Sequence, residues 1–406
     1  MRIASGLPGL ILGIGLIVES SVTALAAEAS RATDFGHGTT GEAAPAGGEA
    51  EALDVAAPES DAGTLPLVSV DTNFELQFDD TFSTSEADAA YRSLYATIEP
   101  EITVNASENF RLFAHMVFEP VLDPPSQTTS YFRDEGLYFE ELNAQGTFGA
   151  LNVAAGLVDP AFGIASDEAP GLYGGDFASN YDYLGAAGVT ADWTLSSRDS
   201  AAGTVEQVIQ ASLFNADRTA LSKSLFTNRG QTRLSDGGVG NTQGPRSFSL
   251  AYTYTTLDSS DEIAGPTARL AVRRLAAGEG DANDELGLVA AAETVYPLSD
   301  DRAVVPIAEV AYFVNEGGGS DNAISTTLGA EFDQGPWALS LTGALHDTQA
   351  SGTPTDYMVT ASVGHDFDVA LAGEYQVSLG YSYAREEGIT GNTVGVLLTK
   401  NFSWQR

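Results

Sequence analysis

Acidic side chains are the residues of this sequence whose type and spacing point most clearly to chemistry. Five lie in one stretch between residues 158 and 182: Asp159, Asp167, Glu168, Asp176 and Asp182. A ring of Asp and Glu attracts cations and repels anions. The same stretch carries regularly placed Gly and Pro and three aromatic side chains, Phe162, Tyr173 and Phe177. This composition is typical of an ordered, functional loop.

Nucleophilic and metal chemistry have much weaker support in the sequence. The chain has four histidines, His37, His115, His346 and His365, and none lies near a Gly-x-Ser-x-Gly turn. Acidic clusters such as Asp281 to Glu285 lack the ligand spacing of a dedicated metal loop. We therefore expect structural histidines, no catalytic residues, no metal and no cofactor, and an enzyme of the outer membrane is kept only as an alternative.

The elements that must position these side chains are short segments in which apolar and polar residues alternate. Ile324, Leu328, Ala330 and Phe332, for example, alternate with Ser325, Thr327, Gly329 and Glu331. Successive side chains of a strand point to opposite faces, so a period of two gives a sheet with one apolar and one polar surface. From Thr72 onward about sixteen such segments can be counted, an even number that suits a transmembrane antiparallel β-barrel over residues 71–406.

The N-terminal part predicts export. Arg2 precedes an apolar run from Leu10 to Val18, and Ala24-Leu25-Ala26 is a small-x-small site, so residues 1–26 read as a signal peptide cleaved after Ala26 or Ala27. Residues 27–70 are rich in Ala, Gly, Glu and Pro without apolar periodicity, and we expect a disordered periplasmic segment. The absence of cysteine means that no disulfide framework holds the exported chain.

The net charge of the chain argues against a nucleic acid partner. Its formal net charge is -38, from 18 basic and 56 acidic residues. Such a surface repels phosphates, so no nucleic acid partner is expected. Two explanations of the acidity remain, solubility in a salty environment and a role in ion selection.

The period of two also assigns inner and outer faces to the strands. It places Glu99 and Glu101 on the inner face of the strand around Ile98, and Arg111 and His115 on that of the next strand. Arg269 and Arg273 have inward parity as well. With Arg111 they are expected to form a basic wall opposite the 158–182 loop, or else to pair with carboxylates of the inner wall.

Two tracts, Leu137 to Gly185 and Leu213 to Tyr252, resemble a poorly characterised porin-like family of Gram-negative bacteria. The resemblance implies an outer-membrane β-barrel that admits small solutes. In sixteen-strand porins the loop at this position folds inward, and by that analogy the five acids would lie at a pore constriction while Phe162, Tyr173 and Phe177 pack against the wall. The alternative is a loop that projects into solvent. Leu157 stands where the family often has a basic residue, which argues against anion selectivity, and Gln405 and Arg406 follow the usual terminal aromatic.

The function expected from these features is that of a porin of the cell outer membrane. It would be a passive diffusion channel for ions and small hydrophilic solutes with a preference for cations, in contact with outer-membrane lipid and lipopolysaccharide. Analogy with porins also suggests a homotrimer. The main alternative is a non-channel exported β-protein, an adhesin or structural β-sandwich, whose sheets would have a packed core on one face.

Overall fold

The structure is a computed structural model that describes residues 66–86, 89–122, 128–200, 203–257, 263–350, 352–370 and 373–406. The expected signal peptide and nearly all of the 27–70 segment lie outside these residues. Residues 67–406 form one compact unit. Its first strand begins at Val68, three residues before the predicted start of the barrel.

Nineteen strand segments are described, of which sixteen are long. The long strands are β1 (Val68–Phe82), β2 (Tyr91–Ser107), β3 (Phe110–Pro120), β5 (Glu135–Phe148), β6 (Leu151–Val158), β7 (Ala186–Ser200), β8 (Gly203–Ala216), β10 (Ser247–Leu257), β11 (Thr267–Leu275), β12 (Glu285–Glu293), β14 (Arg302–Val314), β15 (Ala323–Gln334), β16 (Trp337–Thr348), β17 (Asp356–Val369), β18 (Gly373–Glu386) and β19 (Ile389–Gln405). The short ones are β4 (Thr129–Tyr131), β9 (Leu225–Phe226) and β13 (Tyr296–Ser299). Helical turns are α2 (Ala165–Glu168), α3 (Asp176–Ser179), η1 (Ala220–Ser222), η2 (Leu234–Asp236) and η3 (Glu316–Gly318).

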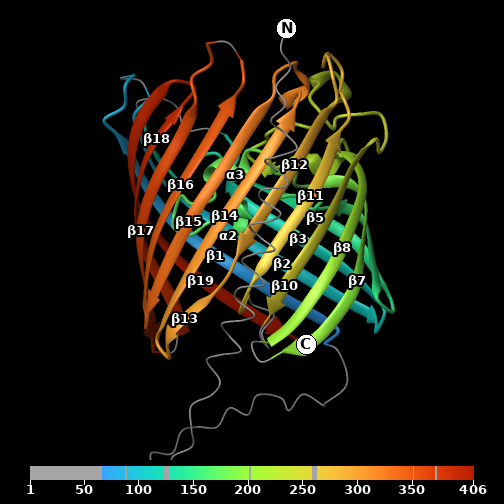
Figure 1. Ribbon diagram of the computed structural model, residues 1–406, viewed down its shortest axis with the longest axis horizontal. Coiled ribbons are helices and arrows are strands. Elements are labelled where there is room, and N and C mark those ends of the chain that lie inside the picture. The colour runs from blue at the N-terminus through green and yellow to red at the C-terminus, as the bar shows by residue number, and fades with distance from the viewer. Residues whose placement is uncertain are drawn as a thin grey trace, which may run out of the picture. The chain divides into compact units, whose positions relative to one another are not determined.

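The long strands form a closed antiparallel barrel (Figure 1). Each pairs with the next long strand along the chain, and β19 pairs with β1 from Ser69 opposite Gln405 to Phe82 opposite Asn392. β4 adds a parallel pairing beside β2, and β13 lies against the start of β14. Closure leaves no unpaired sheet edge, which is the condition for a sheet to span a lipid bilayer. The predicted all-β barrel of about sixteen strands is confirmed.

The two faces of the barrel wall differ as the alternation predicts. Leu328, Leu379 and Val396 are 58, 53 and 43% exposed, so their apolar side lies outside and not in a protein core. Neighbouring Ser325 and Thr327 point the other way and are buried. The alternative of a β-sandwich with a packed apolar core is therefore wrong.

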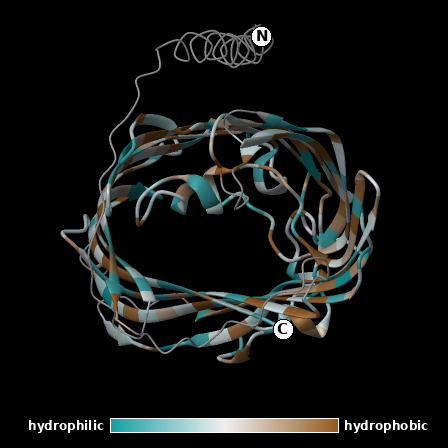
Figure 2. Cartoon of the chain, turned by 90° about the horizontal axis from the view of Figure 1, so that it is seen from below, coloured by the Kyte–Doolittle hydropathy of each residue, from teal (hydrophilic) through white to brown (hydrophobic). Residues whose placement is uncertain are grey.

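The connections are short at one end of the barrel and longer at the other. The connections after β2, β5 and β15 are tight turns. The connections between β7 and β8 and between β17 and β18 are also short, because β8 begins at Gly203 and β18 at Gly373. Residues 159–185 form a long connection at the opposite end, and its helical turns lie inside the ring of strands (Figures 1 and 2). Among the described residues no helix is both long and apolar enough to cross a membrane.

Candidate functional site

The loop of residues 159–185, which we call the inner loop, is anchored at its first turn by a buried carboxylate. Glu309 of β14 is 1% exposed and accepts hydrogen bonds from the backbone N–H of Ile164 at 2.6 Å and of Ala165 at 3.2 Å. The hydroxyl of Tyr181, near the end of the loop, donates to its other oxygen. Gly163 leaves room for this contact, since a Cβ there would lie 2.6 Å from Glu309 Oε1. One side chain thus holds both ends of the loop to one strand.

Two arginines of β11 fix the same part of the inner loop. Arg269 donates to the carbonyl of Gly163 at 2.7 Å, and Arg273 donates to the carbonyl of Tyr181 at 2.7 Å. Arg273 is 2% exposed, lies 3.5 Å from a carboxylate oxygen of Glu285, and stacks on the ring of Phe162. Both arginines have the inward parity that was predicted, but they lie beneath the loop. The expectation that they form a basic wall opposite it is wrong, because a loop that lies along this side of the barrel takes up their donors.

The tip of the inner loop is hydrogen-bonded to three other strands, β16, β17 and β1. Thr342 Oγ1 donates to the carbonyl of Pro170 at 2.8 Å, and the N–H of Leu172 donates to Ser362 Oγ at 2.9 Å. The hydroxyl of Tyr173 donates to Asp79 of β1 at 2.6 Å. Gly171 makes this bend possible, because its φ of 95° is strained for residues with a side chain. The loop therefore crosses from β14 to β1.

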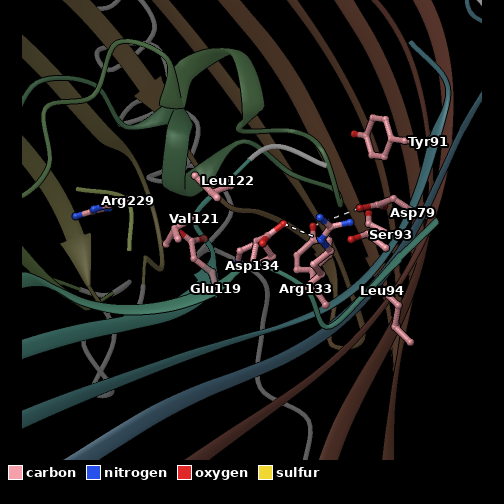
Figure 3. A pocket seen from close by; sticks show the side chains of 13 residues that line it. Asp79, Tyr91, Ser93, Leu94, Glu119, Val121, Leu122, Arg133, Asp134 and Arg229 are labelled. Carbon is pink, nitrogen blue, oxygen red and sulfur yellow. Dashed lines mark hydrogen bonds and ion pairs between the residues drawn. The ribbon is translucent and has the colours of Figure 1, made fainter. Parts of the chain in front are cut away.

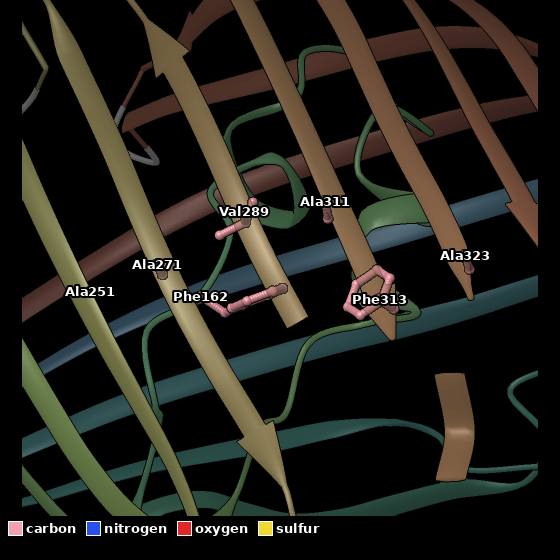
Figure 4. Packing of buried hydrophobic residues seen from close by; sticks show 7 residues of the cluster. All are labelled: Phe162, Ala251, Ala271, Val289, Ala311, Phe313 and Ala323. Atoms are coloured by element: carbon pink, nitrogen blue, oxygen red, sulfur yellow. The ribbon is translucent and has the colours of Figure 1, made fainter. Parts of the chain in front are cut away.

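Aromatic side chains of the inner loop pack on an inner wall of small residues. Phe162 lies in a cluster with Val289 and Phe313 and with alanines of neighbouring strands (Figure 4). A Cβ on Gly287 would come within 2.8 Å of the Phe162 ring. Tyr173 and Phe177 form a second buried cluster with Ala344 and Met358. The structure thus places all three predicted aromatics against the wall.

The acidic side chains of the inner loop take part in none of the anchoring hydrogen bonds described above. Asp159, Asp167, Glu168 and Asp176 are exposed, and Asp182 is half-buried. Desolvation inside the barrel raises the pKa of Asp159 to about 7, with help from Glu141 and Asp182. It also raises the pKa of Asp176 to about 7 and of Asp182 to about 6. Their negative charge is therefore sensitive to pH near neutrality.

A second group of carboxylates lies on the wall formed by β2, β3 and β5. A β-bulge opposite His115 and Met116 makes Glu140 an extra residue, so that Glu140 and Glu141 both face inward. His115 Nδ1 lies 3.1 Å from Glu140 Oε2, and Glu99 and Glu101 lie close enough to act on His115 electrostatically. Glu140 and Glu141 also act electrostatically on Asp159, which directly follows β6, the neighbour of β5, and Glu140 acts on Asp167 of the inner loop. Together with Asp159 and Asp167 they form an acidic site, which we call the acidic constriction.

Sequence reasoning missed Glu140 and Glu141, although a signal was present. Two adjacent acids between Phe139 and Leu142 break the period of two, and such a break within a strand indicates a bulge. Arg111, the third predicted arginine of the inner wall, is exposed and donates to Gln145 at 2.7 Å. It therefore lies on the same side as Glu101 and His115 and not with the arginines of β11.

One hydrogen-bonded Ser, His and Glu trio bears on the enzyme alternative. Ser325 Oγ lies 2.7 Å from His346 Nδ1, and His346 Nε2 lies 3.0 Å from Glu316 Oε1. Ser325 is only 3% exposed, so its hydroxyl is not presented to a substrate, and the trio joins η3 to β15 and β16. Among the described residues no group of three or more His, Cys, Asp or Glu side chains is arranged to hold a metal ion.

A closed antiparallel barrel with an apolar outer face and a polar interior defines an outer-membrane protein. With sixteen long strands and a long loop folded inward, this chain is an outer-membrane β-barrel of porin-like architecture.

Comparisons with known proteins add a likeness to several solved porins and channels. No protein-family model matches the chain, and no curated protein does. A mutant of the Rh. blastica porin shares 14% identity over 82% of this chain and 100% of its own, with a TM-score of 0.47. Pseudomonas aeruginosa OpdK with vanillate shares 9% identity over 83% and 99%, with a TM-score of 0.49. The outer membrane channel DcaP of Acinetobacter baumannii shares 10% identity over 82% and 96%, with a TM-score of 0.47. The barrel assignment itself rests on the strand pairing of this chain.

Proposed function

We propose that this barrel is a passive diffusion channel for ions and small hydrophilic solutes, and that it prefers cations. The observation that carries the proposal is the separation of charges inside the barrel. Arg269 and Arg273 donate to backbone carbonyls of the inner loop, whereas Asp159 and Asp167 lie close enough to Glu140 to interact with it electrostatically. A solute that passes between the loop and the β2, β3 and β5 wall therefore meets carboxylates from two sides.

The direction of the preference follows from the electrostatics of a narrow lumen. Carboxylates within a low-dielectric wall raise the local concentration of cations and lower that of anions. His115 is paired with Glu140 and Arg273 with Glu285, and Arg269 donates to the backbone of the inner loop. The pKa values near 7 of Asp159 and Asp176 imply that the preference grows as the pH rises through neutrality.

Ion-substitution recording in planar bilayers tests the proposal. The purified barrel is expected to give stepwise conductance, and under a KCl gradient the reversal potential should lie toward that of potassium. The double variant Glu140→Gln with Asp159→Asn should move the reversal potential toward zero. Glu108→Gln is the control for each single variant, Glu140→Gln or Asp159→Asn, since it also removes one acidic charge, from the exposed turn between β2 and β3. A current carried mostly by anions would show that the constriction has been assigned wrongly.

Three further properties belong to the same proposal. We infer that the chain is exported by a cleaved N-terminal signal peptide, that its apolar belt contacts lipid and lipopolysaccharide, and that it assembles as a homotrimer. Support for the belt comes from exposed outward side chains such as Leu112, Trp193 and Leu213. The mature N-terminus, chemical cross-linking in outer membranes and co-purified lipid measure the three properties separately.

A further inference from the structure

One arginine of the loop between β8 and β10 is held without a carboxylate partner. The guanidinium carbon of Arg229 lies 3.7 Å over the ring of Tyr138 on β5. Its backbone N–H donates to Ser224 Oγ at 2.8 Å, and its Nε donates to the carbonyl of Ser222 at 3.3 Å. Within the part of the chain that the structure describes, no acidic side chain forms an ion pair with it. Arg229 is exposed, and among the described residues none accepts a hydrogen bond from its two terminal nitrogens.

The same tyrosine also positions a negative charge. The hydroxyl of Tyr138 donates to Glu119 Oε1 at 2.6 Å. One ring therefore carries a cation over its face and a carboxylate at its hydroxyl, and the two charges are close enough to act on each other without forming an ion pair. This arrangement presents opposite charges side by side to the interior of the barrel.

Two cavities meet at this arginine. One, of about 430 Å³, is lined by Glu119, Arg133, Asp134 and Arg229, and by tyrosines of β2. Figure 3 shows Arg229 on one side of it and Asp79, Tyr91 and Ser93 on the other. The second, of about 450 Å³, is lined by Tyr138, Glu140 and Arg229 among others. Both volumes lie in the range of small-molecule sites, and Glu140 connects the second cavity to the acidic constriction.

We propose that Arg229 and Glu119 form a binding site for small zwitterions, solutes that carry both a carboxylate and an ammonium group. The planar fork of the guanidinium binds a carboxylate through two parallel hydrogen bonds. The ammonium group is taken by Glu119 and then by Glu140, from which the solute reaches the acidic constriction. This inference rests on the proposed channel function and names the solute class that it serves.

Reversible block of the single-channel potassium current tests the site with three matched probes. They are γ-aminobutyrate, which carries both charges, butylamine, which carries only the cation, and butyrate, which carries only the anion. We expect γ-aminobutyrate to block at the lowest concentration. Arg229→Gln should weaken that block by about tenfold, the loss of one charge-assisted pair, and should leave the block by butylamine in place. Each block is measured relative to the open current of the same variant.

Two further variants separate binding from a purely structural role of Arg229. Glu119→Gln keeps an acceptor for Tyr138 and lies outside the loop, and it should weaken the block by both amines. Lys223→Gln removes a positive charge from the same loop, lines neither cavity, and should change nothing. If Arg229→Gln weakens all probes equally, or γ-aminobutyrate blocks no better than butylamine, the zwitterion site is wrong. A barrel with no cation preference would overturn the proposed function instead, and a barrel that conducts no current would overturn both.

Discussion

The anchoring of the inner loop by Glu309 leads to the sharpest prediction. Glu309→Ala removes the acceptor of two backbone N–H groups and of the Tyr181 hydroxyl in a buried site. Removing one partner from a buried charged network costs about 3–5 kcal/mol. Since about 1.4 kcal/mol is a factor of ten, the released form of the loop should gain at least about a hundredfold over the anchored form. Glu309→Gln keeps an acceptor for Ile164 and Ala165 and should have a smaller effect.

Single-channel recording and hydrogen exchange measure this release. For Glu309→Ala we expect a larger conductance, more current noise and a weaker cation preference, because the acids of the loop leave the constriction. Amide exchange of residues 160–182 should accelerate. Glu331→Ala, which removes a half-buried carboxylate from β15, is the matched control and should leave the loop protected. Unchanged conductance together with unchanged exchange in Glu309→Ala would refute the anchoring role.

Three other predictions concern pH, a buried charge and a close backbone contact. Lowering the pH from about 8 to about 5 should reduce the cation preference, because Asp159 and Asp176 have pKa values of about 7 and become neutral. Their raised pKa means that the folded state binds protons more tightly than the unfolded state, so acidification should stabilise the anchored loop; lower protection factors of the loop amides at low pH, corrected for the intrinsic pH dependence of exchange, would contradict this. Arg273→Ala should lower the unfolding temperature in detergent, since Glu285 loses its partner at a cost of about 3–5 kcal/mol; an unchanged temperature would count against it. Gly329→Ala should displace the loop and raise conductance, because the new Cβ would lie 2.8 Å from Pro170, whereas Gly343→Ala, with its nearest neighbour at 3.9 Å, should not.

The strands could be predicted from the sequence because the alternation of apolar and polar residues that defines each strand lies within that strand. Alternation along residues such as Ile324 to Glu331 depends only on which face of a strand meets lipid, and every strand of the barrel meets the same two environments. The parity of Arg269 and Arg273 was predicted for the same reason.

The arrangement inside the barrel depends on contacts between distant residues, and there the sequence was less informative. Arg273 was expected opposite the loop because nothing in its neighbourhood shows that Tyr181 and Phe162 cover it. Small residues of the inner wall, such as Gly287 and Gly329, indicate where the loop packs, because a larger side chain there would collide with it. A run of small inward residues on adjacent strands predicts a close approach of another segment, and this signal was overlooked.

The pairing of β1 with β19 has a consequence for how the molecule matures. Thr81 and Thr393 are hydrogen-bonded across this seam and are 312 residues apart in the chain. Neighbouring strands can pair through local turns. The barrel closes only when β1 and β19 meet, and bringing these distant strands together has a large cost in chain entropy. Until then the open sheet has two edge strands with unpaired backbone N–H and C=O groups, which can pair with strands of other chains and cause aggregation. The open form must therefore be protected from aggregation in the cell until β1 and β19 have paired.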